Sequence, residues 1–182
     1  MAFKKKITQS GKGFQMTITA DIEPLDMVSL LLSGNNPKAF KHIQEAMQRS
    51  VEWTRTQVIE KTPGGATGML RKRTGTAVDV TQTSPYNIHG EVFTDIIYAI
   101  PVEEGTKPHF PPRAAILYWV ERKLGLSGKA AENASWAICT AIAKRGTKGQ
   151  HMFEQGYVEA EPYIIKQFEQ AVEKIEKDIL NA

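Results

Sequence analysis

The fold is decided by the stretch Phe14-Gln15-Met16-Thr17-Ile18-Thr19-Ala20, which lies near the start of a chain of 182 residues. Apolar and polar side chains alternate along it, and this period of two is typical of a β-strand that buries one face. A turn-forming run, Ser10-Gly11-Lys12-Gly13, precedes the strand, and residues 3–9 precede the turn. The sequence therefore predicts a β-hairpin at this end of the chain.

A second hairpin is predicted in the middle of the chain. Residues 76–82 and 87–94 have strand character and flank the turn Thr83-Ser84-Pro85-Tyr86. Residues 96–102 are expected to continue as an apolar strand or a short helical turn that ends at Gly105. Because the turns that join adjacent strands are too short for crossover helices, neighbouring strands should be antiparallel.

Helices are predicted on both sides of this hairpin. Asn36 and Pro37 are a good helix start, and apolar residues recur at mostly four-residue steps from there to about Lys61. A short helical turn over 152–158 should lead to Pro162, where a last amphipathic helix begins. Further helices are expected over residues 23–33, 113–124 and 128–144, the last of these capped by Ser127.

These elements predict an α+β fold, in which an antiparallel sheet of hairpins is packed by the long helix and the C-terminal helix. Residues 1–34, the first hairpin and its short helix, are expected to form an arm or extension. Residues 35–182 are expected to form the main domain. A chain of this length has room for one substantial core.

Composition narrows the functional classes. Hydrophobic residues make up 41% and charged residues 24%, which is ordinary for a globular protein. The net charge of +3 does not by itself call for a nucleic-acid partner. The single cysteine, Cys139, excludes an internal disulfide and is expected to be buried. No run approaches the ~18 apolar residues of a membrane span, and no apolar signal segment follows Met1, so neither export nor a membrane is predicted.

The usual signatures of catalysis are not present in the sequence. None of the four histidines has metal-ligand spacing with another histidine or with Cys139. The run Gly146-Thr147-Lys148-Gly149 lacks the preceding strand and the first glycine of a phosphate loop, so we interpret it as a turn. The sequence predicts no enzyme, no metal site and no cofactor, although an enzyme or toxin with an unrecognised site stays an alternative.

Two segments stand out from this background. One is Tyr98-Ala-Ile-Pro-Val-Glu-Glu-Gly-Thr106 and the other is Arg145-Gly-Thr-Lys-Gly-Gln-His-Met-Phe153. Gly105 is expected to adopt a positive φ angle. Of the two adjacent carboxylates, we expect one of Glu103 and Glu104 to be exposed and the other to cap or hydrogen-bond the turn at Gly105 and Thr106. An acid/base pair is the alternative reading of these carboxylates.

Together with the Pro-rich segment 108–112 and the aromatic helix predicted after it, the two segments resemble the tail-component family of long-tailed bacteriophages, also described as tail completion, neck or head-tail joining proteins. The resemblance extends from about Phe40 to Ile175. It implies a structural virion protein, assembled in the host cytoplasm, that forms a ring at the head-tail junction. Six-fold symmetry is favoured and twelve-fold symmetry is the alternative. Its partners would be the neighbouring head-tail connector and tail-tube proteins, and the side of the joint stays open. A DNA-contacting adaptor and a minor tail protein are the other candidates.

Basic residues form three clusters, at Lys4–Lys6, at Arg71–Arg73, and at Lys144, Arg145 and Lys148. We predict that residues 66–73 form a mobile loop, which projects into a pore for non-specific DNA contact or onto a neighbouring subunit. A solvated loop is the simpler alternative. Candidate contact segments are the first hairpin and the loops 62–75 and 105–113. The candidate interface residues are Arg71, Lys72, Arg73, Glu103, Glu104, Gly105 and Thr106.

Overall fold

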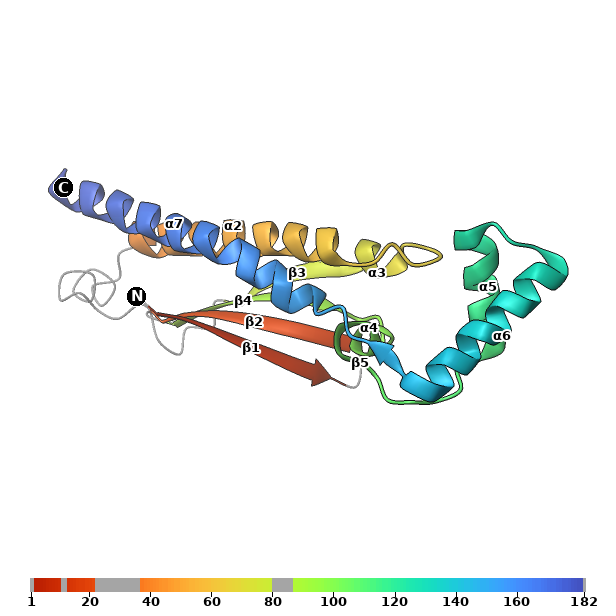
Figure 1. The fold of residues 1–182 in the computed structure, drawn as a ribbon. Coiled ribbons are helices and arrows are strands. Elements are labelled where there is room, and N and C mark those ends of the chain that lie inside the picture. The colour runs from red at the N-terminus through yellow and green to blue at the C-terminus, as the bar shows by residue number, and fades with distance from the viewer. Residues whose placement is uncertain (1, 11–12, 22–36, 80–86, 182) are drawn as a thin grey trace.

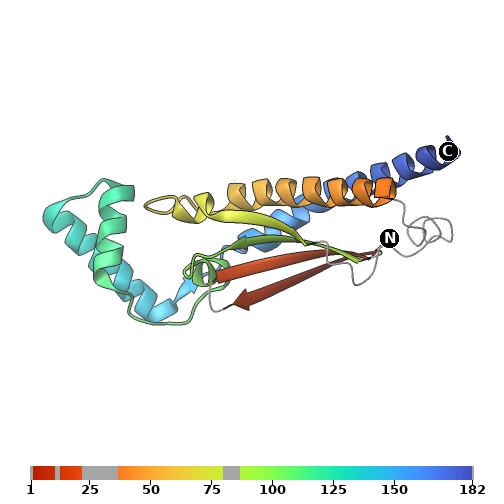
Figure 2. The same cartoon turned by 180° about the vertical axis from the view of Figure 1, so that it is seen from behind.

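The computed structural model describes residues 2–10, 13–21, 37–79 and 87–181. A four-stranded antiparallel sheet forms one layer, in the order β1-β2-β4-β3. Two long helices, α2 (Pro37–Lys61) and α7 (Met152–Leu180), lie side by side on one face of this sheet (Figures 1 and 2). The predicted α+β class is therefore confirmed. The strands are β1 (Ala2–Ser10), β2 (Gly13–Asp21), β3 (Thr74–Asp79) and β4 (Asn87–Thr94).

Both predicted hairpins are present in this sheet. β1 pairs with β2, and β3 pairs with β4, so each hairpin contributes two neighbouring strands. The hairpins join through β2 and β4, where Ile18 lies opposite Gly90. The alternation along β2 is confirmed, because Phe14, Met16, Ile18 and Ala20 are all buried. The N-terminal hairpin therefore supplies an interior strand and part of the main core.

The core lies between the sheet and the two long helices. α2 contributes the stripe that its periodicity predicted, with Ile43, Met47 and Val51 fully buried. α7 covers the same core, and the ring of its Phe153 lies 4.7 Å from that of Phe14 on β2. The phenyl pair thus ties the first strand hairpin to the last helix.

The last helix is longer than the sequence analysis predicted. α7 runs unbroken from Met152 to Leu180, with Pro162 inside it, so the predicted break at this proline is wrong. Proline cannot donate a hydrogen bond to the carbonyl of Val158, but both residues lie on the exposed side of the helix. Burial of Ala160 and Ile164 on the other side keeps both halves on one core. Tertiary packing here outweighs the local cost of the proline.

One other segment differs from the expectations, and another settles an alternative that the sequence left open. Residues 69–72 form a short helix, α3 (Met69–Lys72), in the segment that was predicted to be a mobile loop. The buried side chain of Leu70 anchors it. Residues 99–104 form α4 (Ala99–Glu104), which is the helical alternative and not a strand. The helix predicted over 23–33 and the turn at 83–86 lie outside the described residues.

A helical arm projects from one end of the molecule (Figures 1 and 2). It comprises residues 107–146 and contains the predicted helices α5 (Arg113–Leu124) and α6 (Gly128–Arg145). Ser127 occupies the N-cap position of α6, but its side chain makes no capping hydrogen bond. In the described structure, the side chains that these two helices bury are Val120, Ala131, Ser135 and Cys139. The expected burial of Cys139 is confirmed.

Candidate functional site

The two unusual sequence segments meet at the base of the arm. Strand β5 (Gly105–Thr106) enters the arm and strand β6 (Thr147–Lys148) leaves it, and the two pair as a short antiparallel ladder. The hydroxyl oxygens of Thr106 and Thr147 are hydrogen-bonded at 2.9 Å. The Thr147 amide also donates to the Thr106 hydroxyl at 3.1 Å. We call the unit made by α4, β5, β6 and the first turn of α7 the clamp, because it closes both ends of the arm.

Two glycines allow the strands of the clamp to approach. Gly105 has a φ angle of 81°, which confirms the predicted positive value, and Gly146 has a φ angle of 71°. A Cβ atom at Gly105 would overlap the carbonyl oxygen of Thr147. A Cβ atom at Gly146 would overlap the carbonyl oxygen of Thr106. Each glycine of the two Gly-Thr pairs therefore leaves room for the other strand.

Glu103 connects the clamp to the C-terminal helix. Its side chain is only 3% exposed, and its carboxylate accepts hydrogen bonds from the amides of Phe153 (3.0 Å) and Glu154 (3.4 Å). These amides lie in the first turn of α7, where backbone donors lack partners inside the helix. The predicted capping role is therefore present, but its target is α7 and not the turn at Gly105 and Thr106. Glu104 is exposed, as expected for the other carboxylate.

Backbone contacts complete the junction between α4 and α7. The amide of Gln150 donates to the Val102 carbonyl at 2.8 Å, and the amide of His151 donates to the Glu103 carbonyl at 3.0 Å. Burial raises the pKa of the Glu103 carboxyl above its ordinary value of 4.5, although the hydrogen bonds from the α7 amides oppose this shift. Since both carboxylate oxygens cap the helix, the geometry gives Glu103 a structural role.

The basic cluster at residues 71–73 is held by its own fold. The Nε atom of Arg71 donates to the Thr62 carbonyl at 2.6 Å, and Arg73 forms an ion pair with Asp95. The side chains of the cluster are exposed. Part of the segment that was predicted to be a loop is therefore the helix α3, and these contacts join it to neighbouring residues. Its role as an interface stays a prediction.

The surface of the arm was not identified from the sequence. Phe110 and Trp136 are 53% and 55% exposed, and their rings lie 5.6 Å apart. The guanidinium group of Arg113 lies over the Trp136 ring, 5.9 Å from its centre. The large exposed side chains of the arm are Phe110, Tyr118, Trp119, Leu124, Leu126 and Trp136.

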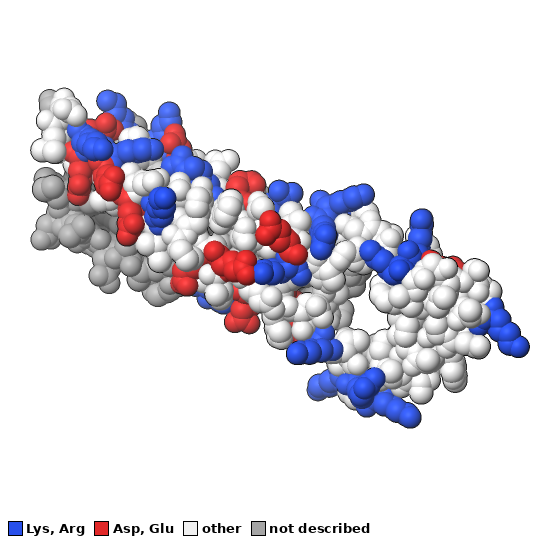
Figure 3. Space-filling view, turned by 45° about the horizontal axis from the view of Figure 1, so that its top comes forward, with Lys and Arg blue, Asp and Glu red and all other residues white. Residues whose placement is uncertain are grey.

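Charge is divided unevenly between the arm and the rest of the chain. Residues 107–146 contain seven Lys and Arg against two Glu, a net charge of +5, although the whole chain carries only +3. Residues 152–180 contain three Lys against seven acidic residues, a net charge of −4. In Figure 3, the charged side chains on the arm are nearly all basic, whereas acidic and basic side chains are mixed over the body. A local count along the sequence would have detected this division, but only the fold shows that 107–146 projects as one unit.

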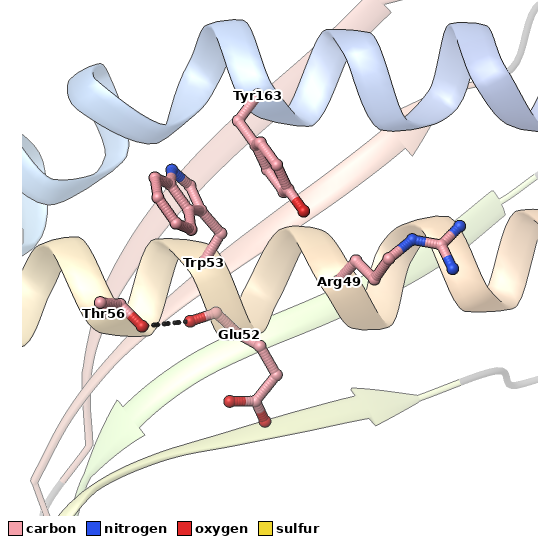
Figure 4. A pocket seen from close by; sticks show the side chains of 5 residues that line it. All are labelled: Arg49, Glu52, Trp53, Thr56 and Tyr163. Carbon is pink, nitrogen blue, oxygen red and sulfur yellow. Dashed lines mark hydrogen bonds between the residues drawn. The ribbon is translucent and has the colours of Figure 1, made fainter.

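A shallow groove lies between the two long helices. Trp53 of α2 and Tyr163 of α7 point toward each other across it, and their rings are stacked with centres 4.9 Å apart (Figure 4). Arg49, Glu52 and Thr56 also line the groove, which has a volume of about 250 Å³. Glu52 points away from the two rings (Figure 4). The groove thus contains no pair of facing carboxylates and serves mainly as the seam between the helices.

The histidines have separate environments. His42 lies half-buried between the long helices, with Nε2 3.0 Å from an Asp178 carboxylate oxygen. His89 is hydrogen-bonded to Thr19 across two strands, and exposed His109 to the Lys107 carbonyl. Across residues 2–10, 13–21, 37–79 and 87–181, no group of three His, Cys, Asp or Glu side chains is placed to bind a metal ion. No helix in these ranges is long and apolar enough to cross a membrane.

Comparisons with protein-family models, curated proteins and solved structures gave no match. The family resemblance therefore rests on the sequence alone. Its features are the two segments that the structure joins in the clamp, and the Pro-rich segment 108–112 with the aromatic helix that follows it.

Proposed function

We propose that this chain is a structural virion protein that assembles into a ring at the head-tail junction of a long-tailed bacteriophage. The observation that carries the proposal is the clamp. The two segments that resemble the tail-component family, separated by 38 residues of sequence, form one structural unit there. Their glycines, threonines and glutamate have architectural roles, which is what an assembly protein requires of its most distinctive residues.

The arm supports the same function. A ring needs segments that reach the next subunit. A head-to-tail contact produces a ring when the rotation that it imposes between neighbouring subunits closes on itself. The arm projects from the body and exposes large apolar side chains. Exposed apolar surface of this kind is typical of protein interaction sites. Six subunits is the favoured number, and the head-tail connector and the tail-tube protein are the proposed neighbours.

Light scattering and electron microscopy of the purified protein test this proposal. The protein is expected to form rings alone or with the neighbouring connector protein, and to have no turnover. A variant without the arm provides the control, with residues 107–146 replaced by Asn-Gly, which suits a two-residue hairpin between β5 and β6. Among the described residues, the main core takes no side chain from 107–146, so this variant should fold but stay monomeric. If the intact protein is monomeric under both conditions, the proposal is wrong.

A DNA-contacting adaptor is the second candidate, and the net charge of +5 on the arm favours it. Phosphate contacts made by Lys and Arg weaken steeply as the salt concentration rises. Fluorescence anisotropy with duplex DNA of mixed sequence, at a series of salt concentrations, measures this contribution. Strong, salt-sensitive binding that the arm-deleted variant lacks would support the adaptor.

A further inference from the structure

We propose that the arm of one copy docks on the exposed face of α7 in the next copy. This inference rests on the proposed ring function, because it names the two surfaces through which the ring closes. The arm surface consists of the six large exposed residues named above and the basic side chains around them. The receiving surface, here called the α7 stripe, consists of Val158, Glu161, Ile165, Glu169, Val172 and Glu176.

The α7 stripe follows from helix geometry. Its members are spaced by three, four, four, three and four residues, so they lie on one face of the helix. Val158 and Ile165, two aliphatic residues of the stripe, are 57% and 40% exposed. Aliphatic side chains and carboxylates alternate along the stripe. The three lysines of α7 lie on other faces of the helix, so all the charged residues of the stripe are acidic.

The arm has the complementary chemistry. Its exposed aromatic and leucine side chains provide an apolar surface against which Val158 and Ile165, which are exposed in the single chain, can pack. Its basic residues lie among those side chains: Arg113 covers Trp136, and Arg122 lies over the Tyr118 ring at 5.6 Å. Docking would bury both apolar surfaces and place guanidinium and ammonium groups near the glutamates. Such charge complementarity contributes to partner specificity and to the orientation of docking.

The positions of the two surfaces favour a second copy of the chain as the occupant. The arm leaves one end of the body, whereas α7, which carries the stripe, lies along the body itself (Figure 1). Two different surfaces of one chain make a head-to-tail contact, which can close into a ring. An arm-to-arm contact would instead bring two surfaces of net charge +5 together. Duplex DNA would satisfy the charges, but its phosphates offer no apolar partner for Phe110 or Leu124.

Charge reversal tests this contact. The arm-reversed variant carries Arg113→Glu, Arg122→Glu and Lys123→Glu, and the stripe-reversed variant carries Glu161→Lys, Glu169→Lys and Glu176→Lys. All six side chains are exposed, so both variants should fold and should melt at the same temperature as the monomer of the unmodified protein. Each variant alone should fail to assemble. Equal amounts mixed together should assemble again, because each reversed surface then meets an oppositely charged one.

Native mass spectrometry measures the outcome. The expected result is an assembly that contains the two variants in equal numbers, with the ring size of the unmodified protein. Reversal of Lys41→Glu and Glu60→Lys, two exposed positions on α2, is the control and should leave assembly unchanged. A reversed variant that melts early is replaced by its neutral counterpart with Gln at the same positions, which should assemble at least tenfold more weakly than the unmodified protein.

The other outcomes are distinct. If the unmodified protein forms rings but the reversed variants also do so, the arm does not dock on the stripe, and the ring function stands without this contact. If the arm-reversed variant loses DNA binding and still forms rings, the basic arm contacts DNA and the inference is overturned. If the unmodified protein never assembles, even with the connector protein, the proposed function itself fails.

Discussion

The body and the arm contain similar apolar residues but use them in opposite ways. In the body, the sheet and the two long helices bury residues such as Phe14, Phe153 and Phe168 completely. In the arm, Phe110 and Trp136 remain about half exposed, and the two helices share a very small interior. The body therefore has the packing expected of a stable domain, whereas the arm has the surface expected of an interface.

The contrast between body and arm indicates where the folding free energy arises. Short helices are marginal in water unless tertiary packing supports them. The long helices receive that support from the sheet, and the arm receives it mainly from its own small contact and from the clamp. Core substitutions should thus affect the stability of the body, and arm substitutions should affect assembly.

The largest effect is expected at the buried phenylalanine. Phe153→Ala removes a fully buried ring that packs on Phe14, and should lower the free energy of unfolding by about 3–5 kcal/mol. Phe110→Ala is the matched control in the arm and should change it by less than about 0.5 kcal/mol. Chemical denaturation of both variants measures the two values. If both substitutions lowered the free energy of unfolding equally, the proposed difference in packing between body and arm would be wrong.

The clamp glycine should have the next largest effect. Gly105→Val forces a β-branched residue into a positive φ angle and places its Cβ against the Thr147 carbonyl oxygen. A loss of roughly 1–3 kcal/mol is expected from the backbone strain alone. Gly125→Ala separates the two causes, because Gly125 has a φ angle of 66° but its added Cβ atom would meet no atom within 4 Å. Gly105→Val should therefore lower the melting temperature more than Gly125→Ala, and the reverse order would remove the close-approach argument.

Glu103 should make stability depend on pH. Its pKa is raised in the folded state, so the folded protein binds this proton more tightly than the unfolded chain does. The stabilisation by the protonated carboxyl is fully present below the unfolded pKa and is lost as the pH rises through the folded value. From pH 4.5 upward, wild type should accordingly lose stability relative to Glu103→Gln, which does not titrate.

Urea denaturation of both proteins across this pH range measures the difference. Glu104→Gln is the control, because this side chain is exposed, and its difference from wild type should vary less with pH. A wild type that gains stability over Glu103→Gln with rising pH would show that the α7 amides outweigh burial.

The smallest effect is expected at the basic cluster. Arg73→Ala removes an exposed ion pair with Asp95, and exposed pairs contribute only about 0.2–1 kcal/mol. Lys72→Ala, at the neighbouring exposed position, provides the comparison. Thermal unfolding at low and high salt should show a small loss for Arg73→Ala that salt reduces. If neutralising all three residues 71–73 weakens assembly without changing stability, the cluster belongs to an interface.

Local patterns in the sequence predicted most of the regular elements. Alternation at Phe14, Met16 and Ile18 predicted β2, and the spacing of Ile43, Met47 and Val51 predicted α2. These predictions succeeded because strands and amphipathic helices repeat with fixed periods. The prediction failed at Pro162, because the helix-breaking effect of proline is local, whereas the core that holds α7 on both sides of it is formed by residues distant in sequence.

The clamp lay beyond any local pattern. Glu103 and Phe153 are 50 residues apart, and so the sequence could predict a capping carboxylate but not the helix that it caps. The exposure of Trp136 could not be predicted for the same reason. The sequence pattern of an apolar residue on a helix is the same whether or not another element covers that residue.

Four features could therefore be predicted from the sequence: most of the secondary structure, the antiparallel pairing within each hairpin, the positive φ angle of Gly105 and the burial of Cys139. The tertiary structure alone decided that two distant Gly-Thr pairs form one ladder and that residues 107–146 project as a basic arm. The physical reason is the range of the interactions. Backbone conformation and side-chain period are set by neighbours along the chain, whereas burial, capping of a distant helix and the separation of charge depend on which surfaces the folded chain brings together.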